Sequence, residues 1–353
     1  MRILVCPPDY FDVNYVINPW MEGQQGRVDR CRAKAQWETL VEHYARAAQV
    51  EIVAAAPDCP DMCFTANAGL VAEDLAVPAR FRMPERSREE APFKEYFANA
   101  DFAVHPLQEE ASFEGEGDAL FAPGESVLWA GYGVRSALET HPALGERFGV
   151  EVLSLRLVDP RFYHLDTCFA PMPDGRVLYF PPAFDERSRR LIEERVPKDA
   201  RIEVSEADAC GFSCNVMRVD DRVFMNQASE ELQRSLANWG YETVICPVDE
   251  FMRAGGGVKC LSLILDQPEF KRLAAPCSAI ASADFELQGH LLDAGLLNRT
   301  LDLITQSGGS FRVDRIDLAE RNDQPSRAVI RIISPTQGEL ETILHRLENE
   351  QSR

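Results

Sequence analysis

Cys260 stands directly after a run of three glycines, Gly255-Gly256-Gly257, and a lysine, Lys259. Glycines let the backbone adopt conformations closed to other residues, and they allow a substrate to come close to the chain. A neighbouring cation and backbone N–H groups both favour the thiolate, which is the nucleophilic form of cysteine. The same stretch is equally compatible with a glycine loop that leads into a buried strand, CLSLIL, with Cys260 as a small apolar side chain.

A histidine and a carboxylate stand two positions apart, as His164 and Asp166, in the stretch YHLDT. If this stretch is an extended strand, the two side chains lie on one side and Leu165 lies on the other. A histidine beside a carboxylate suits proton transfer next to a cationic group. A core histidine with a hydrogen-bonded partner is the alternative, and for this pair taken by itself it is the commoner one.

Two further clusters carry polar groups that suit a guanidinium. Glu114, Glu116 and Asp118 place three carboxylates in FEGEGD, and carboxylates pair well with the planar fork of guanidinium donors. A solvated acidic loop is the ordinary alternative. Asn67, in FTANAG, either caps a turn or offers its amide oxygen to a substrate N–H.

These four clusters lie far apart along the chain, so only folding brings them together. Short apolar strands alternate with helices over the first 270 or so residues, which is typical of an α/β architecture, and their rhythm suits a structural repeat. We predict helices over Cys31–Ala48, Gly133–His141, Glu186–Val196 and Ala228–Gly240, and strands at Met1–Cys6, Val50–Ala56, Asp101–Val104, Leu120–Phe121, Val127–Tyr132, Val150–Leu157, Val177–Phe180, Arg201–Val204, Val216–Val219, Arg222–Phe224, Glu242–Pro247 and Leu261–Leu265.

The chain changes character around Asp266–Ala283, where prolines, charges and small residues gather. We therefore predict two domains, residues 1–270 and a small α+β domain over residues 284–353. The expected elements of the second domain are a strand (Phe285–Leu287), a helix (Leu292–Gln306), two strands (Ser310–Leu318 and Ser326–Ser334) and a final helix (Thr336–Glu350).

Composition narrows the classes of function. A formal charge of −20 argues against binding nucleic acid or an anionic membrane, and it is compatible with a cationic small substrate. No long apolar run or signal peptide is evident, so we expect a cytoplasmic protein without membrane spans. Ten cysteines are then expected to be free thiols. Two C-x3-C pairs, Cys59/Cys63 and Cys210/Cys214, lack matching histidines, so we expect no metal.

The ordered set DMCFTANAG, FEGEGD, HLDT and GGGVKC, with the opening YVINPWM, resembles the guanidine-modifying superfamily. That group contains arginine deiminases, dimethylarginine dimethylaminohydrolases and amidinotransferases, and the resemblance runs from the start of the chain to about Leu265. It implies a pentein fold, which is a five-bladed α/β propeller with the active site in its central channel. It also implies a reaction that needs no metal or organic cofactor.

The resemblance assigns roles to the clusters. Cys260 is the expected nucleophile and His164 the general acid/base, while Glu114 and Asp166 bind and orient the guanidinium. Deiminases commonly show E-G-G-D, one residue shorter than FEGEGD, so Glu116 is an alternative to Glu114 or shares its role.

Two more residues are candidates for holding the rest of the substrate. Arg135, in GYGVRS, resembles the residue that binds the α-carboxylate, although a surface arginine that opens a helix remains the alternative. Asn18, in INPWM, is a weaker candidate for substrate contact.

Asn67 directs the prediction to a subgroup. Deiminases commonly carry an aspartate here, in F-T-R-D, whereas the TANAG pattern is similar to that of cyanobacterial-type arginine dihydrolases, which convert arginine to ornithine, two ammonia and carbon dioxide. A neutral amide would favour keeping citrulline bound.

The tail, ADFELQGHLLDAGLLNRTLDLI, resembles the LOR/SDH domain that follows the catalytic domain in those enzymes. We expect a regulatory or assembly role for it, and a homo-oligomer.

Three alternatives stay open. An arginine deiminase or dimethylargininase would release citrulline after one hydrolytic round. An amidinotransferase would need an amine acceptor. A non-catalytic arginine sensor would bind arginine in the pocket and signal through the tail.

Overall fold

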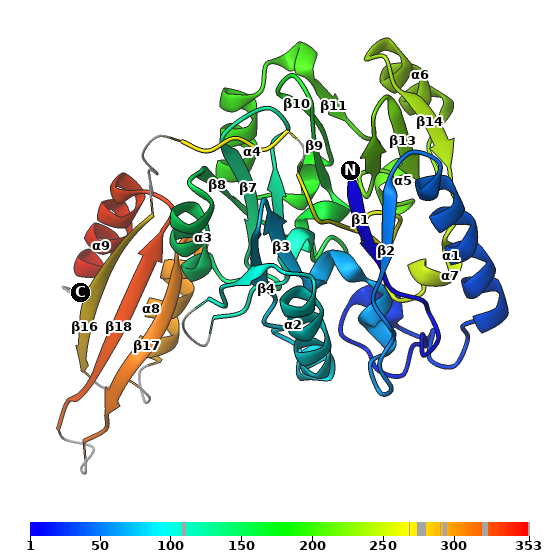
Figure 1. Cartoon of the computed structure of the whole chain (residues 1–353). Coiled ribbons are helices and arrows are strands. Elements are labelled where there is room, and N and C mark those ends of the chain that lie inside the picture. The colour runs from blue at the N-terminus through cyan, green and yellow to red at the C-terminus, as the bar shows by residue number, and fades with distance from the viewer. Residues whose placement is uncertain are drawn as a thin grey trace.

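The computed structural model describes residues 1–107, 111–267, 269–273, 280–289, 291, 295–319 and 324–351. In these ranges the strands form six three-stranded sheets (Figure 1). Five sheets follow one plan: the first strand is antiparallel to the second, and a helix then leads to a third strand parallel to the second. They are β15 (Leu263–Ile264), β1 (Arg2–Val5) and β2 (Gln49–Ile52); β3 (Gly69–Ala72), β4 (Leu75–Pro78) and β5 (Ala103–Val104); β6 (Ala119–Phe121), β7 (Val127–Tyr132) and β8 (Glu151–Arg156); β9 (Phe169–Met172), β10 (Arg176–Tyr179) and β11 (Arg201–Glu203); β12 (Met217–Val219), β13 (Arg222–Met225) and β14 (Glu242–Ile245).

The first of these sheets joins the two ends of the five-sheet region. Ile3 of β1 pairs with Ile264 of β15, although the rest of the domain lies between them in the chain. In the other four sheets the first strand comes directly before the second in the chain. In this sheet the first strand is β15, from the far end of the region, so its pairing with β1 closes the five sheets into a ring. The fold is the predicted pentein propeller.

Each blade carries a helix between its second and third strands, and local sequence fixes where these helices begin. Ser229 caps α6 by accepting a hydrogen bond from the N–H of Leu232, and Asp185 caps α4 in the same way from Ser188. The blade helices are α1 (Arg30–Ala45), α2 (Glu90–Asn99), α3 (His141–Phe148), α4 (Glu186–Arg195) and α6 (Glu230–Asn238), and two short helices are α5 (Glu206–Cys210) and α7 (Asp249–Met252).

Tight turns precede the first strands of the blades and carry the polar motifs. A 3-10 helix, Thr65–Ala68, leads into β3; another, Gly115–Gly117, leads into β6; and a third, Leu165–Thr167, leads into β9. Glu114 and His164 stand just before two of these turns, 50 residues apart. The blade repeat therefore aims corresponding positions at one centre.

Two local predictions were wrong. The expected helix at Gly133–His141 is instead a loop and a short 3-10 turn, and α3 begins at His141, where Pro142 favours a first helical turn. The expected strand at His164–Asp166 is extended only at His164, because Leu165–Thr167 forms a 3-10 helix. Strands β3, β4 and β9 and helix α2 were not predicted.

The tail forms a separate sheet, ordered β16 (Ala281–Gly289), β18 (Ser326–Ser334) and β17 (Ser310–Asp317). Helices α8 (Leu296–Gln306) and α9 (Gln337–Gln351) share an apolar core with it, which gives the predicted α+β unit. Residues 292–294, the start of the predicted helix, lie outside the described residues. The tail lies beside α3 of the ring (Figure 1), and Tyr132 of β7 donates a hydrogen bond to Gly308 at 3.0 Å.

Candidate active site

Cys260 lies at the wall of a small cavity of about 270 Å³, which we call the Cys260 cavity. Four other predicted site residues also line it: Asn18, Asn67, Arg135 and His164. All five side chains are buried. The structure thus brings together residues that the sequence spreads over more than 240 positions, since Asn18 and Cys260 meet at one cavity.

His164 and Glu114 form the acid–base pair of this cavity. The imidazole Nε2 lies 2.7 Å from Oε2 of Glu114, and Nη1 of Arg135 donates to the same oxygen at 3.2 Å. Burial alone would raise the pKa of Glu114, but the charge of Arg135 and the hydrogen bond to His164 lower it to about 2. Glu114 is therefore ionised at neutral pH. It occupies Nε2 and leaves Nδ1 as the nitrogen available to reacting groups.

Asp118 fixes the two loops that carry this pair. Its Oδ1 accepts the N–H of Leu165 at 3.0 Å, and its Oδ2 accepts the hydroxyl of Ser136 at 2.7 Å. Ser136 in turn accepts the N–H of Glu114 at 2.9 Å. The third carboxylate of FEGEGD thus holds the backbone on both sides of the pair.

The thiol of Cys260 has three polar neighbours, one of which is the backbone N–H of Gly257. The Cys260 Sγ lies 3.4 Å from Oδ2 of Asp166, and the Asn215 amide donates to it at 3.1 Å. Burial and the charge of Asp166 raise the pKa of the Cys260 thiol well above its ordinary value. The expected help from Lys259 is absent, because that ammonium points to Glu116 instead.

Close approach explains the glycines of the Cys260 loop. Gly255 has φ of +84°, a conformation that favours glycine, and a Cβ on Gly257 would lie 2.6 Å from Oδ1 of Asn215. Gly117 has the same function on the opposite wall, since a Cβ there would lie 2.2 Å from Nδ2 of Asn67. These glycines let the nucleophile and the Asn67 amide face the cavity.

Asn67 is held by protein groups at both ends of its amide. Its Nδ2 donates to the carbonyl of Glu114 at 3.1 Å, and its Oδ1 accepts from Nη1 of Arg86 at 2.8 Å. Arg86 is itself paired with Glu89 at 2.8 Å. Asn67 therefore has one fixed orientation in the cavity wall.

Arg86, Asp61 and Asn215 were missed by the sequence interpretation. Arg86 and Asp61 line the Cys260 cavity, yet Arg86 lies in a charge run, PERSREE, of the kind that usually faces solvent. Asn215 follows Cys214 just before β12, where the other blades carry their polar turns. That repeat is the signal that could have found it.

Arg135 and Asn18 are committed to protein contacts. Arg135 is buried rather than on the surface; its Nη2 donates to the carbonyl of Ile17 at 2.9 Å and its guanidinium stacks on Tyr163. Asn18 accepts the N–H of Trp20 at 3.0 Å and donates to the carbonyl of Ala254 at 3.0 Å. Asn18 thereby ties the N-terminal segment to the Cys260 loop, and its predicted substrate contact stays a prediction.

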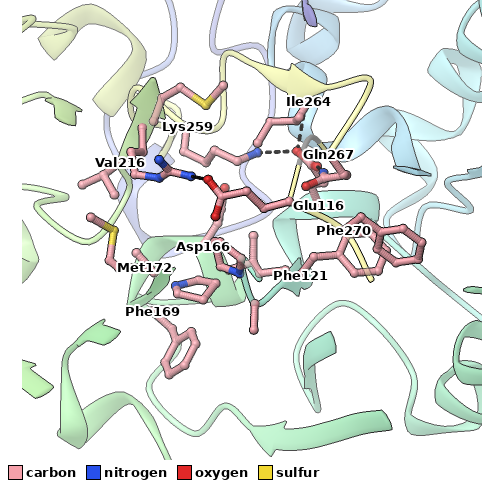
Figure 2. A pocket seen from close by; sticks show the side chains of 18 of the residues that line it. Glu116, Phe121, Asp166, Phe169, Met172, Val216, Lys259, Ile264, Gln267 and Phe270 are labelled. Atoms are coloured by element: carbon pink, nitrogen blue, oxygen red, sulfur yellow. Dashed lines mark hydrogen bonds and ion pairs between the residues drawn. The ribbon is translucent and has the colours of Figure 1, made fainter. Parts of the chain in front are cut away.

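Glu116 lies outside the Cys260 cavity, which corrects its expected place beside Glu114. It faces a second cavity of about 780 Å³, the Lys259 cavity (Figure 2), where Lys259 donates to Oε2 at 2.6 Å. The N–H of Ile264 and the amide of Gln267 also donate to this carboxylate. Three donors from the protein thus hold the Glu116 carboxylate, and its predicted contact with the substrate stays a prediction.

Asp166 stands between the two cavities. It lines the Lys259 cavity (Figure 2), while its Oδ2 reaches Cys260. Its Oδ1 is buried and has no hydrogen-bond partner among the described residues. Burial raises the pKa of Asp166 to about 7. A carboxylate oxygen in this position needs a donor, and a guanidinium or ammonium would supply one.

Within the described residues, no group of three or more histidine, cysteine or acidic side chains is arranged to hold a metal ion. All nine cysteines in those ranges are free thiols, as predicted for them. In the same ranges, no helix is long and apolar enough to span a membrane.

The guanidine-modifying penteins are five-bladed propellers with a cysteine and a histidine–glutamate pair at the active site, and this chain has both features. The chain belongs to the dimethylargininase family: residues 8–265 match the family described as N,N dimethylarginine dimethylhydrolase, eukaryotic. Residues 282–353 match the LOR/SDH bifunctional enzyme conserved region, which agrees with the resemblance of the tail.

Three relatives illustrate this membership. The bifunctional arginine dihydrolase/ornithine cyclodeaminase AgrE of Nostoc sp. is 46% identical over 98% of this chain and 49% of its own length, and its unliganded structure superposes with a TM-score of 0.95 at 45% identity, over 98% of this chain and 51% of that one. A dimethylarginine dimethylaminohydrolase of Mycobacterium tuberculosis is 39% identical over 74% of this chain and 85% of its own. The N-terminal domain of ArgZ, solved as a variant covalently bound to a reaction intermediate, is 48% identical with a TM-score of 0.75, over 76% of this chain and 99% of that one. The chain spans about half the length of AgrE.

Proposed function

We propose that this chain hydrolyses L-arginine to L-ornithine, two ammonia and carbon dioxide, with Cys260 as a covalent nucleophile. The observation that carries the proposal is a small cavity lined by Cys260, His164 and the neutral amide of Asn67, with Glu114 bonded to His164. Its support from relatives is the arginine dihydrolase half of AgrE and the covalent intermediate on the ArgZ domain.

In the first round, the Cys260 thiolate attacks the guanidinium carbon. The guanidinium supplies the donors that the unpartnered oxygen of Asp166 needs, and its charge favours the thiolate that burial otherwise disfavours. His164, oriented by Glu114, protonates the departing ammonia and leaves a covalent thiouronium. Water that His164 deprotonates then attacks this carbon, and citrulline forms as the C–S bond breaks.

In the second round, citrulline stays bound and Cys260 attacks the ureido carbon. A second ammonia leaves, and hydrolysis of the resulting thiocarbamate gives a carbamate that falls apart into ornithine and carbon dioxide. Retention of citrulline is the step that separates this reaction from that of a deiminase. The neutral Asn67 amide supports retention, because it can bind a neutral ureido group without leaving an unpaired buried charge.

One experiment tests both parts. Purified protein is incubated with arginine, methylated arginines and citrulline, and the products are identified by mass over time. Ornithine from arginine and from citrulline is expected. Cys260→Ser should abolish turnover, whereas Cys214→Ser, a matched buried thiol of the same ring, should retain it.

Two outcomes would overturn the proposal. Full turnover by Cys260→Ser would remove the covalent mechanism. Citrulline without ornithine would remove the second round and leave the deiminase or dimethylargininase alternative, which the M. tuberculosis relative favours. The methylated substrates separate those two enzymes.

For the tail we infer a regulatory or assembly role in a cytoplasmic homo-oligomer. The support is that it packs against several elements of the ring. Arg156 of β8 donates to the carbonyl of Thr305, and Arg187 of α4 pairs with Glu339 of α9. Leu138 packs on Ile333, and Glu139 accepts the hydroxyl of Ser310 at 3.0 Å. The loop that bears Leu138 follows Arg135, so the tail lies close to the segment that reaches the Cys260 cavity.

A further inference from the structure

Asn215 is fully buried beneath the nucleophile and makes three hydrogen bonds to the catalytic loops. Its Nδ2 donates to Sγ of Cys260 and to the carbonyl of Asp166, each at 3.1 Å. Its Oδ1 accepts the backbone N–H of Cys260, also at 3.1 Å. One side chain from the blade of β12–β14 thus joins the loops of two other blades.

These partners fix which end of the amide faces the sulfur. The backbone N–H of Cys260 can only donate, so the atom that it meets must be the oxygen of Asn215. The carbonyl of Asp166 can only accept, so the atom that it meets must be the nitrogen. A flipped amide would break both bonds. The sulfur therefore faces an N–H donor.

The Asp166 carboxylate, also next to the sulfur, has the opposite effect on the pKa of the thiol. Oδ2 of Asp166 lies 3.4 Å away and accepts from the thiol, which favours the protonated form. Burial keeps the nearby Tyr44 and Tyr163 neutral. The other titratable or charged groups around Cys260 are Lys259, which is paired with Glu116, and the cavity residues Asp61, Arg86, Arg135 and His164. Two hydrogen bonds to the sulfur favour the anion, one from the backbone N–H of Gly257 and one from the side chain of Asn215.

We propose that Asn215 is a positioning residue for the nucleophile: its amide holds the Cys260 sulfur at a fixed distance from Asp166 and donates a hydrogen bond to the thiolate. This inference rests on the proposed function only in naming Cys260 as the nucleophile. A donor that is already in place costs no reorganisation when the thiolate forms, and it acts again in each round of attack.

Asn226 is a matched control from the same blade. It is also a buried asparagine whose Nδ2 donates to a carbonyl, that of Gly211 at 3.1 Å, and to a sulfur, that of Met252 at 2.9 Å. Its Oδ1 accepts the N–H of Val248 at 2.8 Å. Asn226→Ala therefore removes an equivalent set of bonds without touching the Cys260 loop.

The test measures alkylation of Cys260 by iodoacetamide against pH, with the modified peptide resolved by mass so that the other thiols do not interfere. In Asn215→Ala the pH midpoint should rise by about one unit or more, because a charge-assisted hydrogen bond to the thiolate is lost. In Asn226→Ala it should match the wild type. Arginine kcat should fall at least about tenfold in Asn215→Ala with a smaller change in KM.

A second variant covers failure of Asn215→Ala to fold. Asn215→Asp keeps the shape and the acceptor for the Cys260 N–H but places an oxygen against the sulfur, so its midpoint should rise further. Equal midpoints in the wild type and both Asn215 variants would overturn the inference. Alkylation is measured without substrate. If the wild type did not turn over arginine, the proposed function would be overturned, and the effect of Asn215 on the Cys260 thiol would still stand.

Discussion

Glu114 and Glu116 stand two residues apart at one turn, and each is bonded to a different set of partners. Glu114 meets His164 and Arg135, which line the Cys260 cavity, and the charge of Arg135 and the hydrogen bond to His164 lower the pKa of Glu114 to about 2. Glu116 meets Lys259 in the Lys259 cavity, where burial outweighs the lysine and raises its pKa. Both are buried glutamates with a cationic partner, and both lie in the same motif.

The difference lies in what each partner can do. His164 lines the Cys260 cavity together with Cys260, so the pair that contains it can take part in a reaction. Lys259 is a fixed counter-ion, and Glu116 is further bound by the N–H of Ile264. A turn that projects alternate residues to two sides thus builds a reactive pair and a structural pair from one short sequence.

The largest expected contrast is in activity. Glu114→Gln removes the charge that orients His164, so kcat for arginine should fall by about 10²–10⁴-fold. Glu116→Gln should change kcat by less than about tenfold, since that carboxylate faces away from the Cys260 cavity. Steady-state kinetics on both variants, with circular dichroism to confirm folding, checks this. Equal losses in the two variants would mean that both carboxylates act in the reaction.

The next contrast is in stability. Lys259→Met leaves Glu116 buried without its counter-ion, which should lower the free energy of unfolding by about 3 kcal/mol. The double variant Glu116→Gln/Lys259→Met leaves no buried charge and should recover much of that loss. Urea unfolding at pH 7.5 measures both. If the double variant were as unstable as the single one, packing of the lysine stem rather than charge would hold this cavity together.

The sequence predicted the fold class and most site residues because the motifs are ordered and because strands alternate with helices. Cys260, His164 and Asn67 do line one cavity as expected. Prediction failed where the outcome depends on which side of a turn a residue faces. An i, i+2 pair such as Glu114/Glu116 looks equivalent in sequence, and so does His164/Asp166 if the stretch is taken as a strand. A 3-10 helix follows Glu114 and another follows His164, so the two members of each pair meet different partners.

Buried polar residues from distant segments were the other gap. Arg86 lies in a charge run, and Asn215 stands between Cys214 and Val216 with no charged residue beside it. Both acquire their roles only from contacts, Arg86 with Asn67 and Asn215 with Cys260. No spacing rule within one element could have found them, although the blade repeat places Asn215 just before the first strand of its blade.

The smallest predicted effect concerns the residue between the two cavities. Burial raises the pKa of Asp166 to about 7, so it is largely protonated at pH 6 and ionised at pH 8. Only the ionised form pairs with a guanidinium, so kcat/KM for arginine should rise about tenfold over this range. The same shift implies that Asp166 favours the folded state most below its unfolded pKa, and that this contribution is lost as pH rises through about 7.

The pair in the Lys259 cavity should tune this midpoint in opposite directions. Lys259 lowers the pKa of Asp166 and Glu116 raises it. Lys259→Met should therefore move the rise in kcat/KM to higher pH, and Glu116→Gln should move it to lower pH. Neither variant should abolish the rise. Asp166→Asn is the control, because its kcat/KM should not rise with pH over this range. Unchanged midpoints in both charge variants would mean that Asp166 does not set the profile, and the Lys259 cavity would then have no electrostatic link to the reaction.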